Sequence, residues 1–152
     1  MPMWPPRKIL CPTDFSEGSR AAISQATELA KQFRAAIYLL HAISMQAPPL
    51  PTDPEYSFNL LEANKILDEQ ARRNLQQAAE QLKNAGFATR AIVVVGDAAT
   101  AIVETAEREQ VDLIVIATYG KTGWRRLAFG SVTEKVVRLA TCPVLTIRGN
   151  VQ

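Results

Sequence analysis

The sequence predicts an α/β domain with a doubly wound parallel sheet and helices on both faces. Short apolar runs alternate along the chain with amphipathic stretches of helical spacing. Several of the runs are apolar at nearly every residue, which is typical of strands that are covered on both faces. Strands alternating with helices favour parallel pairing through helical crossovers. The length of 152 residues suits one domain over 1–152 that needs neither metals nor disulfides to build its core.

The expected elements follow from these patterns. The strands are predicted at 8–12, 35–43, 88–95, 111–117 and 143–148, and the helices at 17–33, 59–85, 98–110 and 131–140. Ser16 and Asp97 are candidate N-caps, and Gly86 is a candidate helix stop. In the second helix, the residues expected to face the core are Leu60, Ile66 or Leu67, Ala71, Leu75, Ala78 and Leu82.

Residues 44–58 differ in composition from the rest of the chain. They contain Pro48, Pro49, Pro51 and Pro54, so neither a helix nor a strand is expected there. We expect a Pro-rich surface loop, and loops of this length in a compact domain are usually functional or mobile. It is therefore a candidate element for responding to a ligand. Residues 1–6 are expected to be a flexible N-terminus.

Composition excludes several classes of function. Lys and Arg number 17 and Asp and Glu 15, so the net charge of +2 gives no support to nucleic-acid binding. No apolar run approaches the roughly 20 residues that cross a bilayer, and residues 1–7 do not resemble a secretory signal. A cytoplasmic protein without a membrane partner is expected. Two cysteines and one histidine form no zinc-binding pattern. His41 lies in an apolar run and is expected to be a buried structural histidine rather than part of a Ser-His-acid triad.

The segment 117–131 (ATYGKTGWRRLAFGS) links a buried strand to a helix. Glycines let backbone N–H groups approach an anion, and a helix N-terminus adds donors and a positive dipole end. These features together can form a phosphate site without a catalytic side chain. By itself, however, the segment favours a plain turn with Ser131 as an ordinary N-cap, because glycines and caps are common at strand-to-helix turns. It is neither a P-loop, since Val115 stands where that motif needs glycine, nor a dinucleotide fingerprint, since Thr118 takes the first glycine position.

Ligands of doubly wound sheets bind beyond the carboxyl ends of the strands, where the strand order reverses. The loops after Leu10, Ile43 and Ala117 are therefore the candidate binding loops.

Four segments, KILCPTDFS, LLHAI, VVVGDA and ATYGKTGWRRLAFGSVTEKVVRLATCPVLTIR, together resemble the universal stress proteins of the UspA type over nearly the whole chain. The nucleotide-binding branch of that family has the pattern G-x2-G-x9-G-[ST]. Gly120, Gly130 and Ser131 match it, and Ala117 replaces the first glycine. The resemblance implies a Rossmann-like sheet of order 3-2-1-4-5, a stress-response role, and a homodimer joined through the fifth strand at residues 143–147.

The same resemblance implies a site for ATP, or for AMP or ADP, with Mg²⁺ held on the phosphates. Asp14 would accept hydrogen bonds from the ribose hydroxyls, although its residue type also fits a turn. The backbone of Ala42 would meet the adenine edge, and Lys121 would neutralise phosphate charge. The implied contact residues are Pro12, Thr13, Asp14, Ala42, Ile116, Ala117, Gly120, Lys121, Gly130, Ser131 and Val132.

Three functions stay open on the sequence alone. The first is a regulatory module that binds an adenine nucleotide, and the second, which Ala117 favours, is a nucleotide-free interaction protein of the same fold. The third is a slow ATPase or phosphotransferase, for which no general base or arginine finger is recognisable. Given the implied strand order, Cys11 and Cys142 lie near opposite rims of the sheet, beyond the roughly 7 Å reach of a disulfide, so both are expected to be free.

Overall fold

A computed structural model describes residues 4–44, 54–119 and 129–148. Its sheet has the order β3-β2-β1-β4-β5, and each neighbouring pair is parallel. The strands are β1 (Lys8–Pro12), β2 (Ala36–Ile43), β3 (Thr89–Val95), β4 (Leu113–Ala117) and β5 (Val144–Ile147). The predicted fold class and strand order are therefore confirmed.

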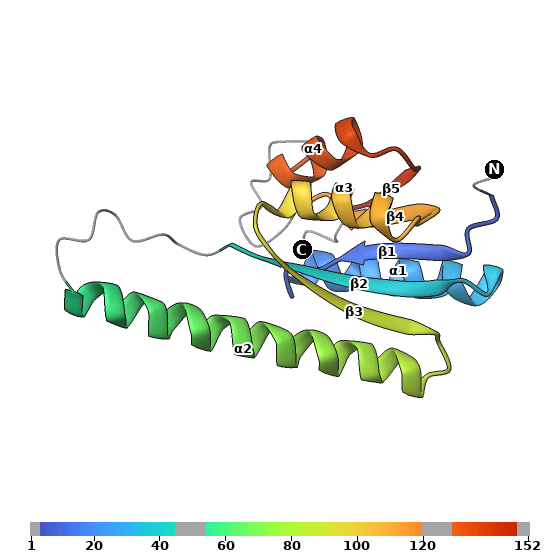
Figure 1. The fold of residues 1–152 in the computed structure, drawn as a ribbon. Helices are drawn as coiled ribbons and strands as arrows, with labels where there is room; N and C mark the ends of the chain where they lie inside the picture. The colour runs from blue at the N-terminus through green and yellow to red at the C-terminus, as the bar shows by residue number, and fades with distance from the viewer. Residues whose placement is uncertain (1–3, 45–53, 120–128, 149–152) are drawn as a thin grey trace.

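Helices cover both faces of this sheet (Figure 1). The helices α1 (Glu17–Phe33) and α2 (Pro54–Asn84) pack on one face, and α3 (Ala98–Arg108) and α4 (Ser131–Leu139) pack on the other. Because successive side chains of a strand point to opposite faces, Ile9 and Cys11 enter the first core layer and Leu10 the second. β4 is buried at every residue, as its continuous apolar run predicts.

The structure corrects the prediction for the start of α2. The helix begins at Pro54, so residues 54–58 are not loop, and residues 45–53 of the predicted loop lie outside the described residues. Proline is tolerated in a first helical turn, where its missing N–H would have no partner. The predicted buried stripe is also wrong in this half of the helix. Ile66 and Leu67 are each 60% exposed, whereas Ala71 and Leu75 are buried.

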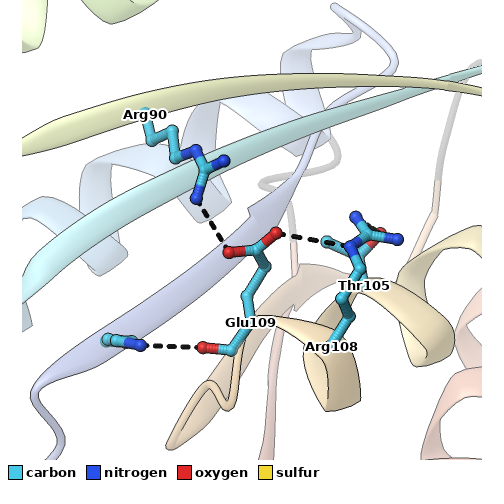
Figure 2. A network of polar contacts seen from close by, with 5 residues as sticks. Arg90, Thr105, Arg108 and Glu109 are labelled. Carbon is cyan, nitrogen blue, oxygen red and sulfur yellow. Dashed lines mark hydrogen bonds and ion pairs between the residues drawn. The ribbon is translucent and has the colours of Figure 1, made fainter.

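A polar network connects the end of α3 to two strands at the amino ends of the sheet (Figure 2). The Arg90 guanidinium of β3 donates to the Glu109 carboxylate at 2.8 Å, and Lys8 of β1 donates to the Glu109 carbonyl oxygen at 2.8 Å. Arg108 contacts the same carboxylate at 3.4 Å. The end of α3 is thereby tied to two strands at the rim opposite the one where the candidate binding loops begin.

Both cysteines are free, as predicted. They belong to different layers, because Cys11 lies in the core under α1 and α2 while Cys142 packs against the core under α3 and α4. Burial raises the pKa of the Cys11 thiol to about 12. Burial also raises the pKa of the half-buried Cys142 thiol.

The buried thiol of Cys11 is expected to make the protein less stable in alkali. In the unfolded chain the Cys11 thiol ionises near pH 8.5 to 9, whereas in the folded protein it stays protonated. The free energy of unfolding is therefore unaffected by this thiol below that pH, and it falls as the pH rises toward 12. Between pH 8 and pH 10, the loss is about 1.4 kcal/mol. Urea unfolding under reducing conditions should show a shallower alkaline decline for Cys11→Ala than for the wild type. An equal decline in both would contradict the buried, protonated thiol.

None of the helices in the three described ranges is long and apolar enough to span a bilayer.

Candidate functional site

A pocket of about 240 Å³ opens at the carboxyl ends of β1, β2 and β4. The strand order reverses at β1, which pairs with β2 on one side and β4 on the other, so the pocket lies where doubly wound sheets bind ligands. The starts of α3 and α4 complete its wall. Its lining residues are Pro12, Thr13, Asp14, Ser19, Leu40, His41, Ala42, Ala98, Ile102, Ile116, Ala117, Tyr119, Gly130, Ser131, Val132 and Thr133.

The turn after β1 is held rigidly by its own side chains. The Asp14 carboxylate accepts from the Ser16 N–H at 3.0 Å, and the Thr13 hydroxyl accepts from the Phe15 N–H at 3.0 Å. The Thr13 N–H donates to the Leu40 carbonyl oxygen at 2.8 Å. Asp14 therefore forms the turn, as its residue type predicts, and its carboxylate also lines the pocket. A carboxylate has several acceptor positions, so its bond within the turn is compatible with binding a ligand hydroxyl.

His41 lies at the pocket rather than in the core. Its Nδ1 is 2.7 Å from the Thr13 carbonyl oxygen, and because a carbonyl only accepts, Nδ1 carries the proton. The ring packs on Phe15 with the ring centroids 4.7 Å apart. This contact fixes the tautomer of the ring, which suits a structural histidine. The expectation of burial is wrong, since His41 is partly exposed. The position that a triad carboxylate would occupy is taken by a backbone carbonyl.

The N-terminus of α4 faces the pocket without a side-chain cap. Ser16 caps α1 and Asp97 caps α3, each accepting an N–H from the first turn, but α4 begins after Gly130, which has no side chain to offer. Ser131 is the first helical residue, so its interpretation as the N-cap is wrong. The first N–H groups of a helix have no intrahelical acceptor, so the donors of residues 131–133 are available to an anion.

Two hydrogen bonds anchor this helix start. The Gly130 N–H donates to the Thr118 carbonyl oxygen at 2.7 Å, and the buried Thr133 hydroxyl donates to the Ala117 carbonyl oxygen at 2.7 Å. A Cβ added at Gly130 would come within 3.2 Å of the Thr118 oxygen. Glycine at 130 therefore permits a close backbone approach, and its own N–H is already used by the protein.

A charge pair joins the starts of α3 and α4 beside the pocket. Lys135 donates to the Asp97 carboxylate at 2.9 Å, and the same carboxylate caps α3 by accepting the Thr100 N–H at 2.9 Å. The hydrogen bonds from Thr100, followed by the bond from Lys135, lower the pKa of Asp97 below its usual range. Asp97 therefore stays ionised and links the two helix starts.

All the predicted contact residues within the described ranges line this one pocket: Pro12, Thr13, Asp14, Ala42, Ile116, Ala117, Gly130, Ser131 and Val132. Gly120 and Lys121 lie outside the described residues. Sequence reasoning missed the remaining lining residues, which are Ser19, Leu40, His41, Ala98, Ile102, Tyr119 and Thr133. Ala98 could have been predicted from its position, because it follows the carboxyl end of β3 as Asp14 follows that of β1.

Comparison with known proteins shows the family to which this chain belongs. Residues 5–148 match the model of the universal stress protein family. The chain belongs to that family. This universal stress protein is 34% identical over 142 residues to universal stress protein MJ0531 of Methanocaldococcus jannaschii, and the match covers 93% of the chain and 82% of its relative.

Solved structures of universal stress proteins share its fold. The structure of MJ0577, a universal stress protein of the same archaeon, matches with a TM-score of 0.81 and 31% identity over 96% of this chain and 98% of that one. A universal stress protein solved in complex with cAMP matches with a TM-score of 0.65 and 25% identity over 95% of this chain and 98% of that one.

Proposed function

We propose that this universal stress protein is a stress-response regulator that binds an adenine nucleotide, ATP foremost, in the pocket at the carboxyl ends of the strands. One observation carries the proposal. The uncapped N-terminus of α4 points its free N–H donors into a pocket at the point where the strand order reverses. The family member solved with cAMP supports an adenine nucleotide as the ligand class.

The pocket lining divides into three parts along the proposed nucleotide. The Asp14 carboxylate accepts hydrogen bonds from the ribose hydroxyls, and the backbone of Ala42 contacts the edge of the adenine ring. The walls around them are formed by Pro12, Thr13, Ile116 and Ala117. The phosphates lie at the start of α4, where the N–H groups of Ser131 and Val132 and the Ser131 hydroxyl donate. Gly130 contributes space there rather than a donor. Gly120 and Lys121 keep their proposed phosphate role.

The alanine that replaces the first glycine of the family motif is compatible with binding. Ala117 belongs to the core layer under α1, and a methyl group added at Gly18 of that helix would lie 3.6 Å from the Ala117 Cβ. The Ala117 methyl therefore packs toward α1. This favours a nucleotide-binding chain over a nucleotide-free one.

We assign Mg²⁺ to the phosphates rather than to the protein. The described residues contain no group of three or more His, Cys, Asp or Glu side chains that could hold a metal ion. The ion would neutralise phosphate charge next to the helix donors.

The proposed assembly is a homodimer through β5. β5 is an edge strand, its Leu145 is exposed, and Val137 and Leu139 on neighbouring α4 are exposed as well. Apolar edge strands pair readily with other strands. The two free thiols suit a reducing compartment, so we place the protein in the cytoplasm.

A binding cycle tests both the ligand and the role of Asp14. Isothermal titration compares ATP with 2′-deoxy-ATP, each with Mg²⁺, on the wild type and on Asp14→Asn, which retains an oxygen for the bond to the Ser16 N–H. The wild type should bind ATP roughly 10- to 150-fold more tightly than the deoxy form, because a hydrogen bond to a charged group contributes about 1.5–3 kcal/mol. In Asp14→Asn, most of that difference should disappear.

The matched control is Glu28→Gln, the same carboxylate-to-amide change at an exposed position of α1. It should keep the full preference for ATP. If neither nucleotide binds the wild type at millimolar concentration, the proposed function is wrong. If both bind but the preference is the same in Asp14→Asn, the nucleotide proposal stands and the ribose role of Asp14 does not.

A further inference from the structure

The pairing of β1 with β2 stops just before the pocket. The register of the two strands ends with Pro12 beside Leu40, and the last bond runs from the Thr13 N–H to the Leu40 carbonyl oxygen at 2.8 Å. In a parallel pair, every second residue of a strand directs both its N–H and its carbonyl oxygen toward the same neighbouring strand. Leu40 is directed toward β1 in this way, so Ala42 is directed toward the same side, beyond the last paired residue of β1.

The groups that would continue this pairing are bound to side chains instead. The next two bonds would join the Ala42 N–H to the Thr13 carbonyl oxygen, and the Phe15 N–H to the Ala42 carbonyl oxygen. The Thr13 carbonyl oxygen instead accepts the Nδ1–H of His41 at 2.7 Å. The Phe15 N–H instead donates to the Thr13 hydroxyl at 3.0 Å. Neither continuing bond forms within residues 4–44, 54–119 and 129–148.

The backbone of Ala42 therefore presents a donor and an acceptor at the pocket that it lines. On its other side the strand is still paired, because Ala42 lies in register with Val94 of β3. The sheet thus holds this backbone edge in place, while its N–H and carbonyl oxygen are left without their partners in the β1–β2 pairing. Backbone polar groups in folded proteins are nearly always paired, so such an edge is suited to a ligand with a matching acceptor and donor.

Adenine has the matching pair of groups. Its 6-amino group donates, and the ring nitrogens on either side of that group, N1 and N7, accept. Guanine has a carbonyl oxygen at position 6, so two acceptors would face each other at the Ala42 carbonyl oxygen. An Ala42 edge with both of its groups available therefore favours adenine over guanine.

We propose that His41 is a positioning residue that gives the pocket its preference for adenine. Its Nδ1–H occupies the Thr13 carbonyl oxygen and so keeps the Ala42 N–H for the base, without His41 itself having to contact the nucleotide. The Phe15 ring, whose centroid is 4.7 Å from that of His41, supports the imidazole in this position. The inference rests on the proposed function, since it concerns the base of the nucleotide bound there.

Hydrogen exchange of backbone amides in the nucleotide-free protein tests the first part of the proposal. In the wild type, the Ala42 amide should exchange faster than the Leu40 amide, which is paired with β1. In His41→Leu, the Thr13 oxygen is released to the Ala42 N–H, so exchange at Ala42 should slow by roughly 2- to 12-fold, the effect of one hydrogen bond on an equilibrium. An Ala42 rate that is the same in the wild type and in His41→Leu would overturn the proposal.

Two further variants separate the hydrogen bond from the shape of the side chain. In His41→Asn, the amide nitrogen is as many bonds from the backbone as Nδ1, so the wild-type rate at Ala42 should return. In His41→Gln, the amide lies one bond further out, so this variant should behave like His41→Leu and replaces it if the leucine variant does not fold. Slow exchange at Ala42 in His41→Asn would contradict the assigned role of the Nδ1–H.

Isothermal titration with ATP and with GTP, each with Mg²⁺, tests the part that concerns the ligand. The wild type should prefer ATP, and His41→Leu should lower that preference by at least roughly 2- to 12-fold, because one hydrogen bond to adenine is lost. His41→Asn should keep the preference. A general loosening of the pocket would weaken both nucleotides alike and leave the preference unchanged, so an unchanged preference in His41→Leu would overturn the proposal.

Phe87→Leu is the matched control. It changes another partly buried ring that packs against the core layer under α1 and α2, but it lies just before β3, at the amino ends of the strands. It should leave both the exchange at Ala42 and the preference for ATP unchanged, and an equal loss of preference in this variant would count against His41. If the wild type binds neither nucleotide, the proposed function fails, and the exchange rates still decide whether His41 ends the pairing of the strands.

Discussion

Replacing Leu75 with alanine is expected to lower the free energy of unfolding by about 2–5 kcal/mol. Leu75 is 0% exposed and lies in the core layer between the sheet and the helices α1 and α2. The other buried residues of α2 are Ala71 and Ala79, and Leu82 is only partly buried against the same core. Among the described residues, Leu75 is therefore the one fully buried large side chain that holds this long helix on the sheet. The truncation removes its contacts and leaves a cavity that two alanines cannot fill. Denaturant unfolding measures the loss.

Leu61→Ala is the matched control for this prediction. It makes the same chemical change in the same helix at a side chain that is 64% exposed. Its effect should stay within about 0.5 kcal/mol, as for other surface substitutions. Equal losses for the two variants would mean that Leu75 does not anchor α2.

The contrast between these two leucines marks a limit of prediction from sequence. Apolar residues at helical spacing predict that a helix has a buried face, and Ala71 and Leu75 confirm it. The same spacing continues through Leu60 and Leu67, but the sheet ends before the helix does, so these residues have no core to enter. How far a partner surface extends is a property of the folded layers and not of the helix that packs on them. The closely spaced prolines of residues 44–58 also led to the prediction of a loop, which overlooked that Pro54 is suited to the first turn of a helix.

The position of the pocket was more predictable than its details. The rule that ligands bind beyond the carboxyl ends of parallel strands places Asp14, Ala42 and Ala117 together, and all three line the pocket. The hydrogen bonds were not predictable, because they depend on contacts between distant segments. The Gly130 N–H, expected to face phosphate, bonds to Thr118, and His41, expected in the core, supports the Thr13 turn.

Gly18→Ala is expected to destabilise the protein by about 1–3 kcal/mol, the usual cost of overpacking. Helix propensity alone predicts the opposite sign, because alanine is about 1 kcal/mol better than glycine inside a helix. Gly18 lies in the first turn of α1, where an added Cβ would come within 2.7 Å of the Tyr119 backbone oxygen. Contact with a backbone atom cannot be relieved by a side-chain rotation, so α1 or the end of the β4 segment must shift.

The same substitution should also weaken nucleotide binding, since Tyr119 lines the pocket and directly precedes Gly120. Thermal unfolding and ATP titration of Gly18→Ala measure the two effects. Ser24→Ala, at an exposed position of the same helix, is the control and should be neutral or slightly stabilising, as propensity predicts. A Gly18→Ala protein that is more stable than the wild type would show that α1 does not approach Tyr119 this closely. If stability falls while ATP affinity is retained, the shift occurs in the helix and leaves the pocket intact.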